Sequence, residues 1–236
     1  MSMSIRSVAL IVALAGGAIA STASATVIAT FSYDDLAGTY TQASPGVGSF
    51  SAVAVDQGPG GLRSWGTTSR LVSPTGDASF QNGFVTQGTA NMVVNVSVNV
   101  INATPGNEFG LGVGSVVVTD ADGDTITADL NGFWTATPNS QGLFLNFNGS
   151  MSNVFLNDNG LGDGTFDGTA AGAWNMGLPG GPPYSGALVQ LVFGAQNFFQ
   201  TGFADRATGV TGQIIPTPGA LALLGLGGIV AGRRRR

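Results

Sequence analysis

The chain has 236 residues, enough for one sizeable domain, and it contains no cysteine, histidine or lysine. These absences exclude a disulfide framework, Ser-His-Asp and Cys-His nucleophiles, the usual zinc sites and lysine Schiff bases. Between Asp34 and Arg206 lie thirteen acidic residues and three arginines, and the resulting net charge of −10 disfavours binding to nucleic acid and to anionic lipid.

Residues 1–25 have the pattern of a secretory signal peptide. Arg6 supplies the positive charge, residues 8–20 form an apolar run, and Ala23 and Ala25 flank the small-residue cleavage site. The apolar run is short for a bilayer core of about 30 Å, which favours cleavage by signal peptidase over a permanent N-terminal anchor. The mature chain is therefore expected to begin near Thr26.

The next segment, to about Thr211, alternates polar and apolar residues and predicts β-strands, with no amphipathic helix of useful length. The clearest strand covers residues 91–101, where apolar residues at every second position predict one buried face and one wet face. Residues 142–147 alternate in the same way. Further strand-like runs occupy residues 27–33, 50–55, 78–85, 133–137, 187–193 and 198–203.

Residues 115–119 and 125–130 predict an antiparallel hairpin, because the sequence Asp-Ala-Asp-Gly-Asp between them suits a tight turn. Many short strands separated by turn residues indicate an all-β body, residues 26–211, with an antiparallel β-sandwich or jelly-roll architecture. A parallel β-helix is the alternative, but no fixed-period repeat supports it. Glycine-rich stretches at 58–61 and 177–186 predict surface loops, with interdomain linkers as the alternative.

Asp120, Asp122 and Asp124 are the strongest candidates for a ligand site, because carboxylates at alternate positions can converge on calcium. The resemblance to an EF-hand loop is partial, since Thr125 stands where glycine is wanted and Asn131 where glutamate is wanted. We therefore expect a solvated β-turn and no cofactor, with calcium as the alternative. A second acidic loop, residues 158–168, resembles a calcium-binding RTX repeat faintly, with different spacing and no second copy.

Two-carboxylate glycoside hydrolysis survives the exclusions made above. Glu108 is the only glutamate, and nothing in the sequence pairs it with a particular aspartate, so we expect no enzyme. The tryptophans Trp65, Trp134 and Trp174 could stack on sugar rings, although tryptophans of β-domains more often fill the core.

The C-terminal segment, residues 212–236, has a proline-bounded break, an apolar run and a basic end. Residues 214–232 would span roughly 28 Å as a helix at about 1.5 Å per residue, just enough to cross a membrane. Four terminal arginines would hold that end in the cytoplasm. The proline motif is Pro216, Thr217 and Pro218, and the basic end is Arg233, Arg234, Arg235 and Arg236.

This segment resembles the PEP-CTERM sorting signal, in which a proline motif, a hydrophobic helix and an arginine cluster follow one another. Thr217 replaces the central glutamate of the family's Pro-Glu-Pro. The resemblance implies recognition by an exosortase, a transpeptidase-like membrane protease, followed by cleavage at the proline motif and delivery of the body to the surface of an exopolysaccharide-producing Gram-negative bacterium. A plain C-terminal anchor is the alternative, although a glycine-rich helix of marginal length suits permanent anchoring poorly.

Together these features predict a secreted, non-enzymatic protein of the cell surface or extracellular (biofilm) matrix. Its expected partners are signal peptidase, an exosortase, transiently the inner membrane, and exopolysaccharide, but not nucleic acid. The alternative is a carbohydrate-binding adhesin, which predicts at least two tryptophans exposed along one groove or face. A glycosidase would place Glu108 and an aspartate about 5 to 9 Å apart across a cleft.

Overall fold

A computed structural model describes residues 26–56, 64–81, 83–86, 89–140, 142–160 and 163–217. The predicted signal peptide with Ala23 and Ala25, and the predicted sorting tail from Pro218 to the arginine cluster, lie outside this part. The described residues contain no helix long and apolar enough to cross a bilayer. Their strands are β1 (Ala29–Ser44), β2 (Val47–Val53), β3 (Trp65–Arg70), β4 (Gly76–Gln81), β5 (Phe84–Thr86), β6 (Thr89–Ala90), β7 (Met92–Asn102), β8 (Phe109–Thr119), β9 (Thr125–Asn139), β10 (Gly142–Asn157), β11 (Thr165–Asp167), β12 (Ala173–Asn175), β13 (Tyr184–Ala195) and β14 (Phe203–Ile215).

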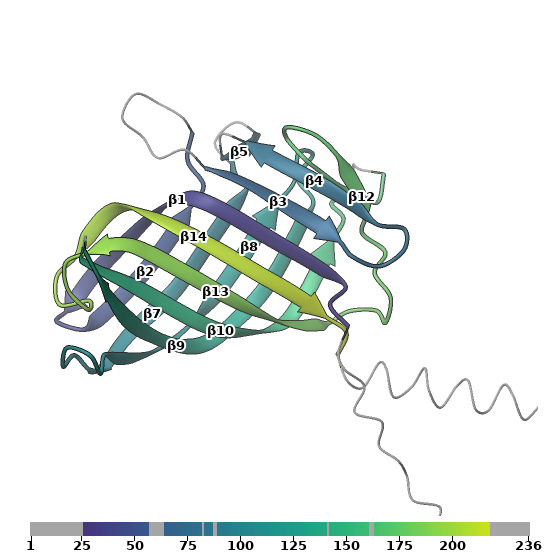
Figure 1. Ribbon diagram of the computed structural model, residues 1–236. Coiled ribbons are helices and arrows are strands. Elements are labelled where there is room, and N and C mark those ends of the chain that lie inside the picture. The colour runs from purple at the N-terminus through teal and green to yellow at the C-terminus, as the bar shows by residue number, and fades with distance from the viewer. Residues whose placement is uncertain are drawn as a thin grey trace, which may run out of the picture.

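Eight of these strands form one closed antiparallel barrel. Their order is β14-β13-β10-β9-β8-β7-β2-β1, and β14 also pairs with β1, which completes the ring (Figure 1). The predicted all-β class is confirmed, whereas the sandwich or jelly roll is not, because a single sheet curves onto itself instead of two sheets facing each other. Each barrel strand still buries one face, so the alternation in the sequence is the same for both architectures.

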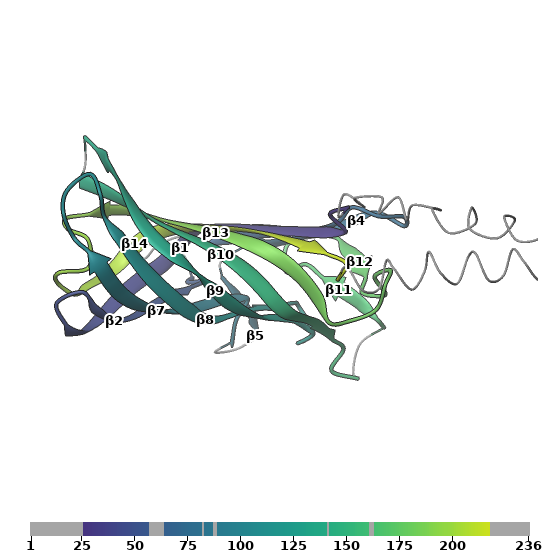
Figure 2. The ribbon, with the colours of Figure 1, turned by 90° about the horizontal axis from the view of Figure 1, so that it is seen from below.

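The long strand β1 holds a side flap on the barrel. One edge of β1 pairs with β14, while the other edge pairs with β3 over Ala29 to Asp34 and with β2 from Ala37 onward. A bulge separates these two halves at Asp35, whose φ is 55°. Strands β3 and β4 therefore leave the ring as a hairpin flap (Figure 1), and in Figure 2 the β4 strand lies at the end of the molecule that also carries β11 and β12.

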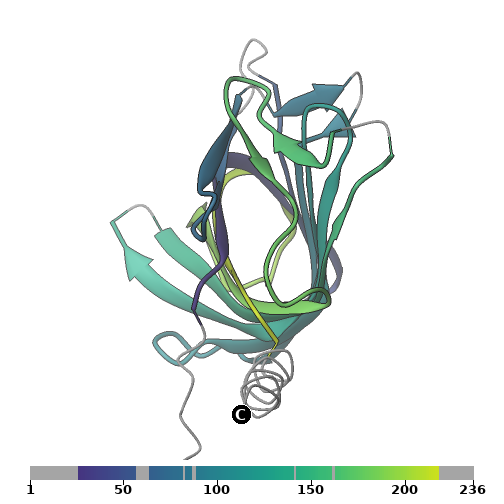
Figure 3. The ribbon, with the colours of Figure 1, turned by 90° about the vertical axis from the view of Figure 1, so that its right-hand side faces the viewer.

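Both ends of the folded body lie at the same rim of the barrel. Ala29 pairs with Ile214, and the Ile28 N–H donates to the Ile214 carbonyl at 2.9 Å. We call this end the terminal rim, which Figure 3 views end-on. It also carries the Asp120–Asp124 turn, residues 158–160 and 163–164, and the loop at 177–183. The far rim carries the connections that follow β1, β7, β9 and β13.

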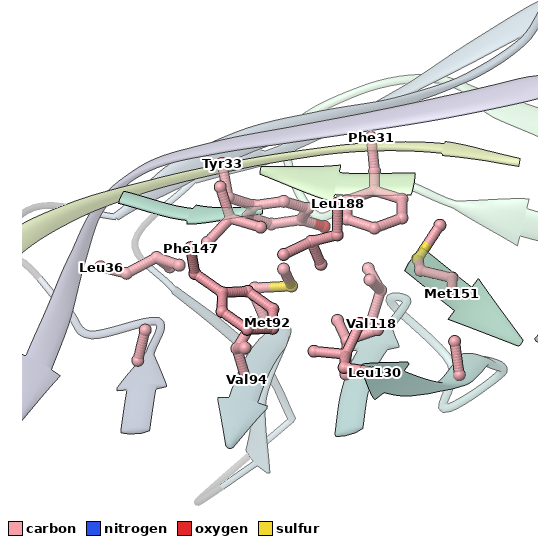
Figure 4. Packing of buried hydrophobic residues seen from close by; sticks show 14 of the residues in the cluster. Phe31, Tyr33, Leu36, Met92, Val94, Val118, Leu130, Phe147, Met151 and Leu188 are labelled. Atoms are coloured by element: carbon pink, nitrogen blue, oxygen red, sulfur yellow. The ribbon is translucent and has the colours of Figure 1, made fainter. Parts of the chain in front are cut away.

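Large aromatic rings such as Phe31, Tyr33 and Phe147 point into the core (Figure 4), and glycines on neighbouring strands leave room for them. A methyl group added to Gly66 would overlap the Tyr33 ring, and one added to Gly212 would overlap the Phe31 ring. Trp134, fully buried, packs against Phe147 with ring centroids 5.0 Å apart. Alternation of small and large inward residues fills a narrow barrel, which explains part of the high glycine content.

Most predicted strands are confirmed, including residues 91–101 as β7 and the hairpin of β8 and β9. The strand predicted at 198–203 is wrong: residues 198–201 form a bend, in which Phe198 and Phe199 are buried, and β14 begins only at Phe203. Strands β3 and β14 are rich in glycine and polar residues, so their sequences do not show the alternation that predicts a strand. Strand β14 continues past Thr211 to Ile215.

Candidate functional site

The Asp120 carboxylate organises the β8–β9 turn at the terminal rim. Its Oδ1 accepts N–H bonds from Asp122 at 3.2 Å, Gly123 at 2.9 Å and Asp124 at 2.7 Å. Its Oδ2 accepts the Asp167 N–H at 2.8 Å, from a segment 47 residues further along the chain. The predicted turn is therefore present. It is not solvated as predicted, because Asp120 and Asp124 are buried and Asp120 links the turn to β11.

The neighbouring loop at 158–160 completes this connection. The Asn159 N–H donates to Asp124 Oδ1 at 2.7 Å, and the Asn159 side-chain amide donates to the Asp122 carbonyl at 2.7 Å. Asp163, proposed above as part of a faint RTX resemblance, accepts the Thr165 N–H at 2.9 Å. The two acidic segments thus contact each other, and their carboxylates mainly order the backbone.

A cation would find only part of a ligand shell in this cluster. Asp120, Asp122 and Asp124 each offer an oxygen within 4.8 Å of the others, as the calcium hypothesis requires. However, three N–H groups occupy Asp120 Oδ1, which leaves Asp122 and the buried, unpartnered Oδ2 of Asp124 as the freest ligands among the described residues. Calcium takes about six to eight oxygens, so most would have to come from backbone carbonyls and water.

The buried aspartates hold their protons more tightly than free ones. Burial raises the pKa of Asp120 to about 7, although the N–H groups of Asp167, Asp124 and Gly123 act in the opposite direction. Burial also raises the pKa of Asp124, with smaller contributions from the nearby carboxylates of Asp122 and other acids, against the Asn159 N–H. Both shifts disfavour charge in the turn.

Glu108, the glycosidase candidate, lies at the far rim between β7 and β8. It is 8% exposed, and its Oε2 accepts the Gly106 N–H at 2.8 Å within the same loop. This contact orders the turn that Gly106 forms with a φ of 82°. The carboxylate therefore has a local structural partner.

The three tryptophans divide into two core residues and one surface residue. Trp134 is fully buried and donates its indole N–H to the Ser97 carbonyl at 3.2 Å, and Trp174, 3% exposed, donates to the Thr68 hydroxyl at 2.8 Å. Trp65 is 51% exposed on β3. Two of the three tryptophans thus fill the core, as tryptophans of β-domains more often do, and the exposed pair that the adhesin alternative predicts is not formed.

Two contacts at the terminal rim could not be predicted from the sequence, because each joins segments that are far apart along the chain. Buried Arg70 donates to backbone carbonyls of Val72, Ser73, Asn175 and Gly177, and so joins the end of β3 to the segment after β12. The Thr217 hydroxyl donates to the Pro183 carbonyl. Thr217, the central residue of the proline motif, thus lies against the loop at 177–183, and the preceding Pro216 is buried.

A scan of protein-family models, a search of curated proteins and a search of solved structures each found no match to this chain.

Proposed function

We propose that the protein is exported and that its barrel is displayed at the cell surface or in the extracellular matrix as a non-enzymatic component. In this proposal the signal peptide directs export, and the PEP-CTERM-like tail is a temporary membrane anchor removed by an exosortase. The inner membrane is then a transient partner, and the barrel is the lasting product.

The pairing of β1 with β14 carries this proposal. The first and last strands close the ring, so all eight strands of the described barrel lie between Ala29 and Ile215. Removal of both flanking segments leaves every strand of the barrel in place, and termini that lie at the surface tolerate such cleavage. The proline motif begins at Pro216, directly after β14.

The position of the termini also supports display. Both flanking segments leave from the terminal rim, so an anchor attached there would direct the far rim away from the membrane. The connections of that rim would then face the outside. A body with a net charge of −10 would also be repelled by an anionic lipid surface, which favours release after cleavage.

The hydrogen bond from the Thr217 hydroxyl to the Pro183 carbonyl holds the start of the proposed anchor against a loop of the barrel. Exosortase access to the proline motif would require this contact to open, because Thr217 is the central residue of the motif. A Thr217→Glu variant, which restores the family's central residue, is therefore expected to be processed faster. Thr217→Val, similar in shape but unable to donate, separates loss of the contact from gain of the glutamate.

The proposal is tested by expressing the full chain in a Gram-negative host with and without an exosortase. We expect the tail to be lost, and the body to reach the surface, only when the exosortase is present. A variant with both Pro216 and Pro218 replaced by Ala should stay uncleaved in the inner membrane. Accumulation of the full chain in the cytosol in both hosts would contradict the proposal.

A further inference from the structure

The outer face of the β3–β4 flap carries a groove beside the exposed tryptophan. Its volume is about 540 Å³, within the range of about 300 to 1,000 Å³ usual for small-ligand sites. The lining residues are Trp65, Gly66, Thr67, Ser79, Phe80, Gln81 and Ala170.

Four of these side chains form two cross-strand pairs on one face. Trp65 pairs with Gln81, and Thr67 pairs with Ser79. Paired residues of antiparallel strands project to the same side, so the indole, the amide and two hydroxyls lie together. Within the described part of the chain, no hydrogen bond engages the side chains of Thr67, Ser79 or Gln81.

The groove is fixed on both sides. The Ser79 N–H donates to the Ala171 carbonyl at 2.7 Å, and the Ala170 N–H donates to the Ser79 carbonyl at 2.9 Å, which holds the loop at 168–172 along the free edge of β4. On the inner side, the Tyr33 ring packs against Gly66 and supports β3 from within. A ligand would therefore meet a surface that is already ordered, which lowers the entropy cost of binding.

The lining combines an apolar ring with neutral donors and acceptors, and it contains no charged residue. A sugar ring has the matching chemistry, because its C–H face packs on an aromatic ring while its hydroxyls both donate and accept. A purely apolar ligand would leave the amide and hydroxyls unpaired. An acidic polymer would approach a body with a net charge of −10 against repulsion.

We propose that this groove binds a neutral pyranose unit of a polysaccharide, with the sugar ring against Trp65 and its hydroxyls bonded to Gln81, Thr67 and Ser79. This site deepens the proposed function, since it gives a displayed barrel a contact with the surrounding polysaccharide. It needs only one tryptophan and short sugar segments, unlike the multi-tryptophan groove predicted from the sequence. Because a single aromatic ring contacts the sugar, we expect the affinity of each groove for one sugar unit to be weak.

The test uses the full chain in a detergent without sugar groups. The probes are a soluble β-glucan, a galactomannan and dextran, with alginate as the acidic comparison. Trp65 is the exposed one of three tryptophans, so acrylamide quenching of fluorescence reports mainly on its side chain. We expect at least one neutral polymer to protect Trp65 from quenching, and alginate to give no protection.

Variants then locate the site by affinity electrophoresis in gels containing the bound polymer. Trp65→Ala should weaken binding by about tenfold or more, the effect of losing about 1.4 kcal/mol, whereas Trp65→Phe keeps a smaller ring and should lose less. Gln81→Ala should weaken binding by a few-fold through lost hydrogen bonds. Phe133→Ala is the matched control, because Phe133 is 42% exposed on β9, outside the groove.

Three results would overturn the assignment: no neutral polymer protects Trp65, Trp65→Ala binds as well as the wild type, or alginate binds best. Circular dichroism of each variant shows whether the fold is kept, and Trp65→Phe serves if Trp65→Ala unfolds. The assay does not depend on export or tail cleavage. Its failure would therefore remove the sugar site and leave the display proposal standing.

Discussion

Replacing Asp120 should loosen the terminal rim, because one carboxylate holds four backbone N–H groups there. In Asp120→Ala, water can replace the acceptor for the exposed part of the turn. The N–H groups of buried Asp124 and half-buried Asp167 lose their partner with less access to solvent. Two such losses at about 1.5 kcal/mol each give about 3 kcal/mol of destabilisation.

A loss of about 3 kcal/mol lowers the Tm of a domain of this size by about 6 to 12 °C, and thermal unfolding followed by circular dichroism measures it. Asp120→Asn keeps one acceptor oxygen but presents an NH₂ group near the other position, so it should lose about half as much. Asp77→Asn is the matched control, because the Asp77 side chain is exposed on β4 and makes no hydrogen bond within the described residues; its change should stay within about 0.5 kcal/mol. Equal stability of Asp120→Ala and the wild type would refute the role given to this carboxylate.

The wild type should lose stability as the pH rises from about 4 to about 7, because folded Asp120 keeps its proton to about pH 7 while the unfolded chain releases it near the usual value of 3.8. Asp120→Asn should flatten that slope in urea titrations, and a slope of the opposite sign would show that the charged form is favoured. Excess chelator should leave the Tm unchanged, because N–H groups already occupy Asp120 Oδ1; a Tm that rises with added calcium would instead establish a bound ion. Gly66→Ala should lower the free energy of unfolding by about 1 to 3 kcal/mol, because the added methyl group clashes with the Tyr33 ring. Gly209→Ala is the control, since the nearest atom to its added methyl group is 3.4 Å away. Equal urea midpoints for the two variants would count against the packing of the Tyr33 ring on Gly66.

Local features of the fold could be predicted from the sequence because they depend on neighbours along the chain. The apolar residues of β7 recur at every second position, and the Asp-Gly turn joins β8 to β9 as predicted. The closure of the barrel could not be predicted in this way. It requires Ala29 to pair with Ile214, and no short-range pattern distinguishes an inner barrel face from the inner face of a sandwich.

In the candidate sites, too, local features could be predicted from the sequence, whereas contacts between distant segments could not. Turn chemistry placed Asp120 correctly in a tight turn, but its bond to Asp167 depends on how the loops of the terminal rim meet. The three tryptophans were equivalent in the sequence. Only the folded chain separates Trp65, on the outer face of a flap, from Trp134 and Trp174 in the interior. The polar partners of Trp65 come from β4, so they could be found only once β3 and β4 were paired.

The proposed function depends on a barrel that is complete between two removable segments. Terminal peptides of the native protein, recovered from its own cells and identified by mass spectrometry, test this most directly. We predict an N-terminus near Thr26, a C-terminus at the proline motif, and recovery from the surface or extracellular fraction. A cytosolic polypeptide that still carries Met1 and Arg236 would contradict it.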